Sequence, residues 1–324
     1  MRLRPGALLI GLAIGALGSV ALRLGVGPDG LEWPRDATEW SLRGARAASG
    51  AAVGGSLAIA GVFLQALLRN PLAEPAVLGL TSGAGLGVVV SLYLSYLTTG
   101  AMLLYRPPAE AALLGALAVL ALVGVLGQRR GVLEPFSLVL TGVVVSLICG
   151  AGIVFVQHLL PDQGMAMASR WTFGAISDDV PTWWIVGVGA LAMLSSFAGI
   201  RWGPAMDAAT LSDDEARSLG VRLGVLRAGL FIASGALSAG AVLLAGPIGF
   251  VGLVCPHAVR LLCGARHRVV VPTAGLMGWM LIVLADAGVR VFDVGSGRMP
   301  IGVLTALLGG PVFLWLLRRE RTWL

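Results

Sequence analysis

Gly61–Gly87 reads GVFLQALLRNPLAEPAVLGLTSGAGLG, and this stretch decides how the rest of the chain is interpreted. An apolar helix pattern runs into Arg69, Asn70 and Pro71, Pro75 follows, and a second apolar segment with regular glycines begins beyond it. Irregular polar backbone between two membrane segments is tolerated only where protein or a water-filled cavity satisfies its hydrogen bonds. The stretch therefore indicates a transport path.

The composition is that of a polytopic membrane protein. Mean hydropathy is +0.88, 57% of the residues are hydrophobic and 12% are charged. A soluble domain of this length has too little interior to hide so much apolar surface. Gly50 and Gly54, and the series Gly79, Gly83 and Gly87, have the small-xxx-small spacing that predicts closely packed membrane helices.

Ten apolar segments of spanning length, or close to it, predict an all-α fold in a single transmembrane domain over residues 1–324. The eighth is short for a full span and contains Pro256, so we expect a half-helix or a broken helix there. The first has the length of a retained anchor rather than of a cleaved signal peptide. The segments cover residues 5–24, 47–68, 76–97, 109–127, 136–160, 183–201, 227–246, 250–264, 272–292 and 301–317.

The positive charge comes entirely from arginine, because the chain contains no lysine. A Walker loop needs that lysine, so any ATP-driven work must come from another chain. Alternating the ten segments from a cytoplasmic N-terminus puts fifteen arginines on the inner side and eight on the outer side, which favours both termini in the cytoplasm. Arginines at loop edges serve membrane topology and do not indicate a nucleic-acid partner.

Two loops are long enough to carry structure of their own. The outer loop, residues 161–181, predicts a re-entrant or capping element. The inner loop, residues 203–226, predicts a short amphipathic helix at the cytoplasmic surface. Most other inner loops are very short, so this one is interpreted as a docking element for a cytoplasmic partner.

Local signals define the inner helix. Ser212 is a good N-cap and Glu215 follows three residues later, which is a capping box. Ala216 and Leu219 provide an apolar side, and Gly220 can end the helix. The predicted docking residues are Leu211, Ser212, Asp213, Asp214, Glu215, Ala216, Arg217, Ser218, Leu219 and Gly220.

The three cysteines, Cys149, Cys255 and Cys263, lie in apolar surroundings without CxxC spacing. We interpret them as small buried hydrophobes rather than metal ligands or disulfide partners. The sequence contains no HExxH motif and no evident nucleophile–base pair, which argues against an integral-membrane enzyme. We expect no catalytic residues, no metal site and no cofactor bound by this chain.

Three blocks carry a resemblance to a known family. They are residues 58–85, residues 211–221 and residues 245–272, the last followed by LADAGVR (284–290) and MPIGVLTALLGGPVFLWLL (299–317). In their order and spacing they closely resemble the FecCD family, the permease subunits of ABC importers for ferric siderophores, haem and vitamin B12. The resemblance runs from about Arg43 to the C-terminus.

The resemblance implies partners and a place in the cell. Such permeases form homodimers with ten helices per subunit, with the path along the two-fold axis. Two cytoplasmic ATP-binding subunits, which hold ATP and magnesium, sit below, and a periplasmic binding protein docks on top. The inner helix then matches the family's coupling helix. We expect a multi-pass protein of the bacterial inner membrane, surrounded by lipid.

The resemblance also implies docking residues for the binding protein. Outward arginines of the vitamin B12 permease match Arg43, Arg46 and Arg290 here. Arg43 and Arg46 are expected just ahead of the second helix, and Arg290 lies four residues after Asp286, where a salt pair is as plausible as docking. The family's glutamate at the entry to the tenth helix is Arg298 in this chain, which changes the charge of the outer rim.

The expected pore and gate are built from small residues. Ser146, Cys149 and Gly150 lie on the fifth helix, which faces the axis in relatives, and are small enough to form an inner gate. Asn70 and Pro71 are expected at the cytoplasmic end of the second helix, as a structural and gating turn that closes one side of the path.

Histidine and methionine side chains are candidate contacts for an iron porphyrin. His158 lies near the outer end of the fifth helix, with Met165 and Met167 close by in sequence, although methionine is also ordinary apolar filler. His257 and His267 belong to a block that the family shows whatever its substrate. We assign these two histidines structural or gating roles.

The sequence leaves two alternatives to an iron-chelate importer. Cobalamin is the alternative substrate, and a proton-coupled secondary carrier is the alternative mechanism. Such a carrier would use an intramembrane carboxylate, for which Glu74 and Asp286 are the candidates. Both acids have arginine nearby in sequence, Arg69 and Arg290, so fixed structural pairing is the preferred interpretation.

Overall fold

The computed structural model describes residues 4–27, 30–100, 109–129, 131–177, 180–291 and 299–320. In chain order its elements are α1 (Pro5–Leu24), β1 (Val26–Gly27), β2 (Gly30–Leu31), α2 (Ala37–Leu68), the 3-10 turn η1 (Pro75–Leu78), α3 (Leu80–Thr99), α4 (Ala109–Leu126), β3 (Gln128–Arg129), β4 (Val132–Leu133), α5 (Pro135–Leu159), α6 (Asp162–Thr172), α7 (Thr182–Ala209), α8 (Asp213–Ser218), α9 (Leu223–Ala245), α10 (Val251–Cys263), α11 (His267–Val291) and α12 (Ile301–Glu320).

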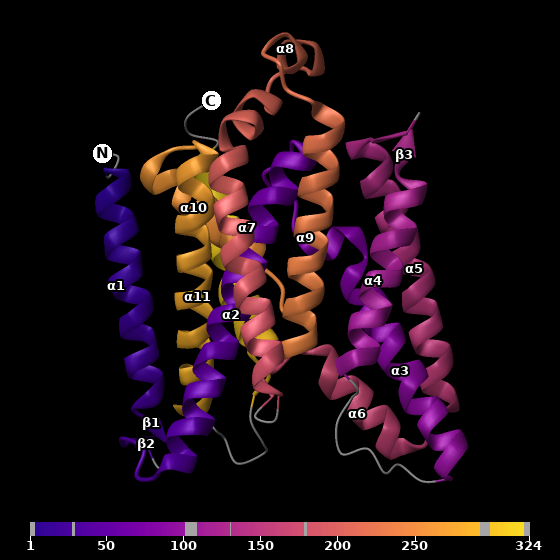
Figure 1. The fold of residues 1–324 in the computed structure, drawn as a ribbon. Coiled ribbons are helices and arrows are strands. Elements are labelled where there is room, and N and C mark those ends of the chain that lie inside the picture. Colours follow the sequence, from indigo (N-terminus) through magenta and orange to yellow (C-terminus); the bar gives the residue numbers. More distant parts are fainter. Residues whose placement is uncertain are drawn as a thin grey trace.

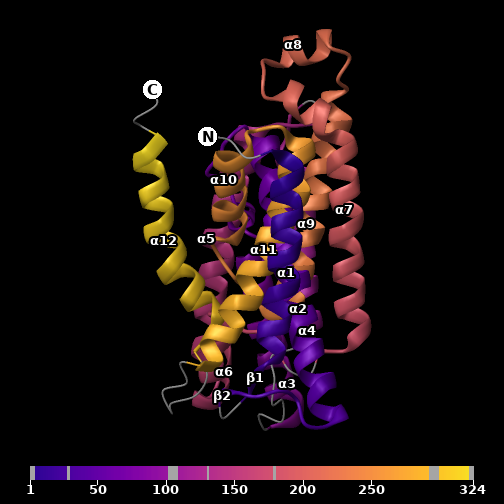
Figure 2. The ribbon, with the colours of Figure 1, turned by 90° about the vertical axis from the view of Figure 1, so that its left-hand side faces the viewer.

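Ten of the twelve helices in the described ranges correspond to the ten predicted segments, so the all-α prediction is confirmed. Eight are long and apolar enough to cross a membrane, and α10 and α12 are shorter apolar helices. The other two, α6 and α8, lie at opposite ends of the bundle (Figure 1). Helix α1 begins, and α12 ends, at the end that carries α8 (Figure 2).

Two helices extend further than hydropathy predicts. Helix α2 begins at Ala37 instead of residue 47, with Asp36 as its N-cap. It continues through Arg43 and Arg46 because acidic side chains neutralise both guanidinium groups. Helix α7 continues to Ala209 instead of residue 201, so the inner loop is shorter than expected.

Helix α2 is the centre of the bundle. In its most apolar window 94% of the residues are buried, and α7, α9, α10 and α11 pack around it. Gly54 and Gly61 allow its backbone to touch its neighbours: a Cβ at Gly54 would lie 2.0 Å from the Gly278 carbonyl oxygen, and one at Gly61 would lie 1.9 Å from that of Gly252. The predicted close packing through small residues is confirmed here.

Helix α10 starts near the middle of the bundle's thickness and lies in the half that holds α8 (Figures 1 and 2). Its thirteen residues include Pro256, which confirms the predicted half-helix. Gly252, in its first turn, sits against Leu57 and Gly61 of α2. These residues precede Arg69 by 12 and 8 positions, or roughly 18 and 12 Å at 1.5 Å per residue. The start of α10 therefore lies deep in the membrane.

The segment after α2 reaches the same depth. A Cβ at Gly252 would lie 3.0 Å from the Pro75 ring, so Pro75 sits beside the start of α10, well below Arg69. The expectation that the whole Asn70–Pro75 turn stays at the inner end of α2 is therefore wrong. Only its first residues lie there, because the chain descends again before α3 begins.

Candidate functional site

The inner loop folds as its local signals predict. Helix α8 has Ser212 as N-cap and a complete capping box: the Glu215 amide donates to the Ser212 hydroxyl at 3.3 Å, and the Ser212 amide donates to the Glu215 carboxylate at 3.0 Å. These hydrogen bonds hold the pKa of Glu215 below its ordinary value of 4.5. Gly220 follows the helix with a φ of +81°, a conformation that glycine adopts without strain.

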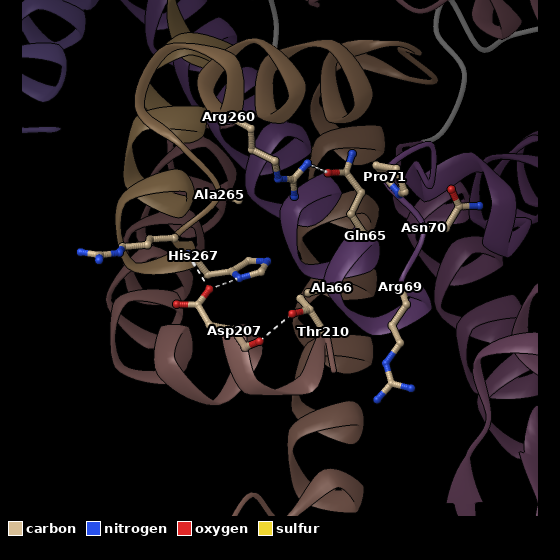
Figure 3. Close-up of a pocket in the computed structure, with 11 residues that line it drawn as sticks. Gln65, Ala66, Arg69, Asn70, Pro71, Asp207, Thr210, Arg260, Ala265 and His267 are labelled. Carbon is tan, nitrogen blue, oxygen red and sulfur yellow. Dashed lines mark hydrogen bonds and ion pairs between the residues drawn. The ribbon is translucent and has the colours of Figure 1, made fainter. Parts of the chain in front are cut away.

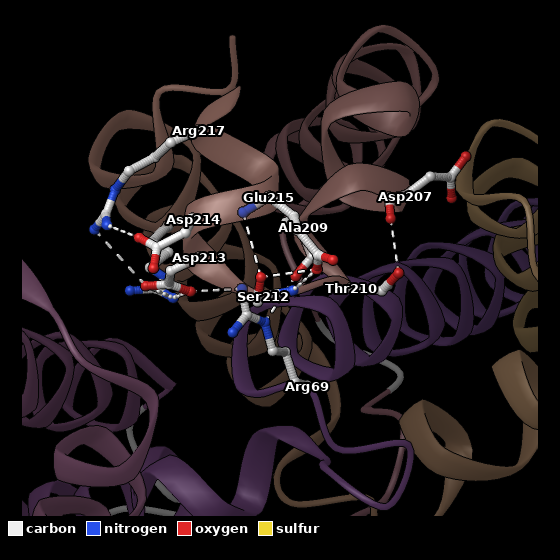
Figure 4. Close-up of polar contacts among 10 residues, drawn as sticks. Arg69, Asp207, Ala209, Thr210, Ser212, Asp213, Asp214, Glu215 and Arg217 are labelled. Carbon is white, nitrogen blue, oxygen red and sulfur yellow. Dashed lines mark hydrogen bonds and ion pairs between the residues drawn. The ribbon is translucent and has the colours of Figure 1, made fainter. Parts of the chain in front are cut away.

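Two arginines from other elements fix α8 in place (Figure 4). The Asp213 carboxylate forms ion pairs with the Arg69 guanidinium group at 2.6 Å and with that of Arg227 at 2.8 Å. Burial alone would raise the pKa of Asp213, but the hydrogen bonds and charges of Arg69 and Arg227 outweigh it and lower the pKa below its ordinary value of 3.8. Arg69 also donates to the Ala209 carbonyl at 2.7 Å. The end of α2 therefore holds both the end of α7 and the start of α8.

The surface around α8 is partly apolar, because the leucines on either side of the helix are exposed. Leu219 is 64% exposed and Leu211 is 47% exposed, whereas Ala216 is fully buried against the bundle. The expected single apolar side formed by Ala216 and Leu219 is thus wrong, because the alanine packs inward and the leucine points to the solvent. Exposed leucines beside charged Asp214 and Arg217 form a surface suited to a protein partner.

A pocket of about 560 Å³ opens at the same end of the bundle. Asn70 and Pro71 line it, as Figure 3 shows, together with side chains from α2, α7, α10 and α11. His267 donates its backbone amide to Asp207 at 3.0 Å, and its Nδ1 lies 2.6 Å from the same carboxylate oxygen. Asp207 thereby ties the end of α7 to the start of α11, which supports a structural role for His267.

A second cavity, of about 450 Å³, lies beside the start of α10. Most of its lining is apolar, glycine or hydroxyl, and Glu74 is its one carboxylate among the described residues. The carboxylate accepts the Phe250 amide at 3.1 Å. Phe250 is the N-cap of α10 and has a φ of +70°, so Glu74 binds a strained residue directly before the half-helix. Cavity walls come from η1, α3, α6, α9 and α12 as well.

The predicted gate residues of α5 do not line this cavity. Cys149 is buried in the core, and Ser146 packs against Gly79, where a Cβ would lie 2.8 Å from the serine oxygen. Gly150 has open space around it. The exposed face of α5 carries larger side chains, including Leu147 and Ile148. A role of Ser146, Cys149 and Gly150 in gating stays a prediction.

Arg43 and Arg46 have partners inside this chain. Both lie within α2, so the expectation that they precede the helix is wrong, and they are only 4% and 5% exposed. Arg46 binds the buried Asp286 carboxylate through two nitrogens, at 2.8 to 3.0 Å. Arg23 of α1 donates to the same carboxylate. Among the described residues, the arginines that pair with Asp286 are therefore Arg23 and Arg46 rather than the expected Arg290.

The other two arginines predicted for docking, Arg43 and Arg290, are also partly or fully buried. Arg43 is held by Glu39 at 2.9 Å and by the Glu32 carbonyl at 2.6 Å. Arg290 is half-buried near the end of α11, and Arg298 lies outside the described residues. Docking of a binding protein on Arg43, Arg46 or Arg290 stays a prediction.

Of the three residues predicted to contact an iron porphyrin, two are exposed and one packs against a buried cluster. His158 and Met165 are exposed at the end that holds α6. Met167 instead packs against a buried cluster that includes Leu160 and Ala168, which supports its interpretation as apolar filler. Within the described residues no group of three or more His, Cys, Asp or Glu side chains could hold a metal ion.

Sequence reasoning missed one residue that joins several elements. Gln65 is buried on α2, donates to the Ala73 carbonyl at 3.3 Å and to the Gly252 carbonyl at 3.1 Å, and accepts from Arg260. Its signal was a lone amide in the otherwise apolar run before Arg69, because a polar side chain at that depth needs partners.

Comparison with known proteins places these features in a family. A profile of the FecCD transport family matches residues 8–319. The chain belongs to the FecCD transport family. The match begins well before Arg43, the start of the resemblance in sequence motifs, and includes nearly all of α1.

Named relatives are permeases. The hemin transport system permease protein HmuU of Yersinia pestis is 35% identical over 99% of this chain and 96% of its own length. The vitamin B12 import system permease protein BtuC of Vibrio cholerae is 35% identical over 87% of this chain and 82% of its own. A solved structure described as an inward-facing conformation of a putative metal-chelate type ABC transporter matches with a TM-score of 0.83 and 27% identity, over 97% of this chain and 99% of that one.

These similarities fix the general role of the chain. It is a multi-pass membrane protein and an ABC importer permease of the FecCD family. Its relatives are transport subunits, consistent with the expectation that it is not itself an enzyme.

Proposed function

We propose that this chain is the permease subunit of an importer that moves an iron chelate, haem or a ferric siderophore, from the periplasm to the cytoplasm of a bacterium. The observation that carries the proposal is the match to a hemin permease along 99% of the chain. Helix α8, anchored by two arginines and presenting exposed leucines, supports the importer part of it. The end of the bundle that carries α8, and with it both termini, faces the cytoplasm of the inner membrane.

The assembly contains two copies of this chain, two ATP-binding subunits and one periplasmic binding protein. ATP and magnesium bind to the ATP-binding subunits, because this chain has no lysine for a Walker loop. The largely exposed apolar face of α5 offers a surface to the second copy or to lipid. The α6 end faces the binding protein.

Transport follows alternating access. ATP binding and hydrolysis move the paired ATP-binding subunits, α8 follows them, and the two permease copies tilt about their interface. The cavity beside α10 then opens to one side and later to the other. Its mostly small and apolar lining suits a large ligand that passes without being held tightly.

Reconstitution tests the importer function. Liposomes that contain this chain, its ATP-binding subunit and the binding protein should accumulate substrate only with internal ATP. Accumulation driven by a proton gradient without ATP would instead support the secondary carrier. The buried ion pairs of Asp286 argue against this residue as the proton carrier, because a proton-carrying carboxylate must exchange with water.

Cobalamin is the second candidate substrate, because vitamin B12 permeases match nearly as well. Titration of the binding protein with haem, a ferric siderophore and cobalamin separates the three. A shift of the Soret band on adding haem supports haem transport, and tight binding of cobalamin alone contradicts the iron-chelate proposal.

A further inference from the structure

Polar contacts connect α8 to the deep cavity through the segment that follows α2. The connection starts at Arg69, whose side chain binds Asp213 of α8 and the Ala209 carbonyl at the end of α7. Arg69 is also the C-cap of α2, with a φ of +49°. Because a non-glycine residue rarely adopts this conformation, the surrounding contacts must hold it. Any displacement of α8 therefore acts directly on the end of α2 and on the residues that follow.

The connection continues through two side chains that form hydrogen bonds with the start of the half-helix α10. Gln65 donates to Ala73, in the descending segment, and to Gly252, in the first turn of α10. Glu74 accepts the amide of Phe250, the residue before that turn. The descending segment and the start of α10 are thus joined at two points, and Gly252 lies against the α2 backbone.

The connection ends at α12. A Cβ at Gly309 would lie 2.7 Å from the Phe250 side chain, so Phe250 packs directly on that helix. Gly302, Val303, Ala306 and Leu307 of α12 line the cavity. A shift of the residue before α10 must therefore move the cavity wall or break the packing against it.

We infer that Arg69, Gln65 and Glu74 are positioning residues that transmit the movement of α8 to the cavity wall formed by the start of α10 and by α12. The inference rests on the proposed ATP-driven transport and adds the route by which hydrolysis is coupled to it. Rigid backbone contacts at Gly61 and Gly252 favour transmission, because packed interfaces switch between discrete arrangements instead of deforming gradually.

The test measures ATP hydrolysed per substrate molecule imported by the full assembly in liposomes. Glu74→Met and Gln65→Met keep side-chain length but remove the hydrogen bonds, and each should raise this ratio at least about fivefold. Glu74→Gln keeps an oxygen that accepts the Phe250 amide and should stay within about twofold of the wild type. Matched controls are Glu134→Met and Gln128→Met, whose side-chain bonds to described residues stay within the hairpin and helix ends around β3 and β4.

A double-variant comparison tests the connection itself. Asp213→Ala and Glu74→Met act on side chains that do not touch, so independent effects would multiply. If they interrupt one connection, the double variant should show about the same ratio as the worse single variant. Multiplied effects, or an unchanged ratio in both single variants, would overturn the inference.

Amide exchange provides a measurement that does not depend on how well the Glu74 and Gln65 variants assemble. In the wild-type assembly, a non-hydrolysable ATP analogue should change exchange in the first turn of α10, and in Arg69→Ala it should not. Amide exchange in α10 that does not change with nucleotide in the wild-type assembly would contradict the inference. Absence of any ATP-driven uptake by the wild-type assembly would contradict the proposed function instead, so the two failures are distinguishable.

Discussion

Arg46 on α2 and Asp286 on α11 are 240 residues apart in sequence and form a buried two-nitrogen ion pair. Arg23 of α1 donates to the same carboxylate. Side chains of three helices, α1, α2 and α11, therefore meet at this one carboxylate. Such a cluster is favourable only while every member is present, since a remaining buried charge is costly.

Removing the shared carboxylate should destabilise the protein strongly. Asp286→Asn leaves two buried guanidinium groups facing a neutral amide, and we expect a loss of about 3–5 kcal/mol. Arg35→Ala is the control, because its ion pair with Glu32 is exposed and should cost less than about 1 kcal/mol. Thermal unfolding in detergent measures both. Equal melting temperatures for the two variants would contradict the structural role of Asp286.

Backbone contact between α2 and α11 can be tested with one methyl group. Gly54→Ala places a Cβ 2.0 Å from the Gly278 carbonyl oxygen, so the helices must separate, at a cost of about 1–3 kcal/mol or more. Gly55→Ala, the next residue, meets its nearest neighbour at 3.7 Å and should leave the melting temperature unchanged or slightly higher. Similar losses for the two variants would show that α2 and α11 do not pack as described.

The anchoring of α8 should depend on Asp213 and not on its neighbour. Asp213→Asn removes the charge that binds Arg69 and Arg227, so amide exchange over residues 213–219 should accelerate severalfold. Asp214→Asn should have little effect, because Asp214 is 95% exposed. Hydrogen exchange with mass spectrometry compares the two.

The pH dependence of α8 follows from the same contacts. Because the pKa of Asp213 lies below its ordinary value of 3.8 in the folded protein, its stabilising effect is complete above that value. The effect is lost as the pH falls through the lower, folded pKa. Exchange in α8, corrected for the intrinsic rate, should be constant from pH 8 to pH 5. A rise already between pH 7 and 6 would contradict this assignment.

The exposed Leu219, the C-cap of α8, should contribute to binding the ATP-binding subunit. Leu219→Asp puts a charge where an apolar contact is expected and should weaken the complex by about tenfold or more, roughly 1.4 kcal/mol. Val132→Asp makes the same change on the β3–β4 hairpin at the same end. Binding measured in detergent by interferometry should fall for Leu219→Asp only, and an equal fall for both would indicate a nonspecific charge effect.

Local signals predicted α8 well, because a capping box, a first-turn acid and a terminal glycine act within ten residues. The half-helix α10 was also predictable, since its length and Pro256 are local facts. The partners of Asp286 were not predictable, because the nearest arginine in sequence is Arg290 and the true partners come from α1 and α2. Only the fold shows whether a charged residue pairs with a neighbour on its own helix or with residues that are distant in sequence.

The boundaries of α2 show the same limit. Hydropathy ends a membrane segment at charged residues, so the helix was expected to start after Arg46. In the fold, Glu39 of the same helix and Glu32 neutralise Arg43, Asp286 of α11 neutralises Arg46, and the helix starts at Ala37. The depth of Pro75 could not be predicted from the sequence either. It is set by the contact of Pro75 with α10, which is distant in sequence.

The enclosure of α2 has a consequence for how the protein responds to its membrane. Helices that face lipid adjust to bilayer thickness by tilting, but α2 is surrounded by protein over 94% of its apolar window. The corresponding windows of α1, α4 and α5 are only 28%, 22% and 17% buried. Adaptation to a thicker or thinner bilayer should therefore fall on these outer helices, while the distance between the charged contacts at the two ends of α2 stays fixed.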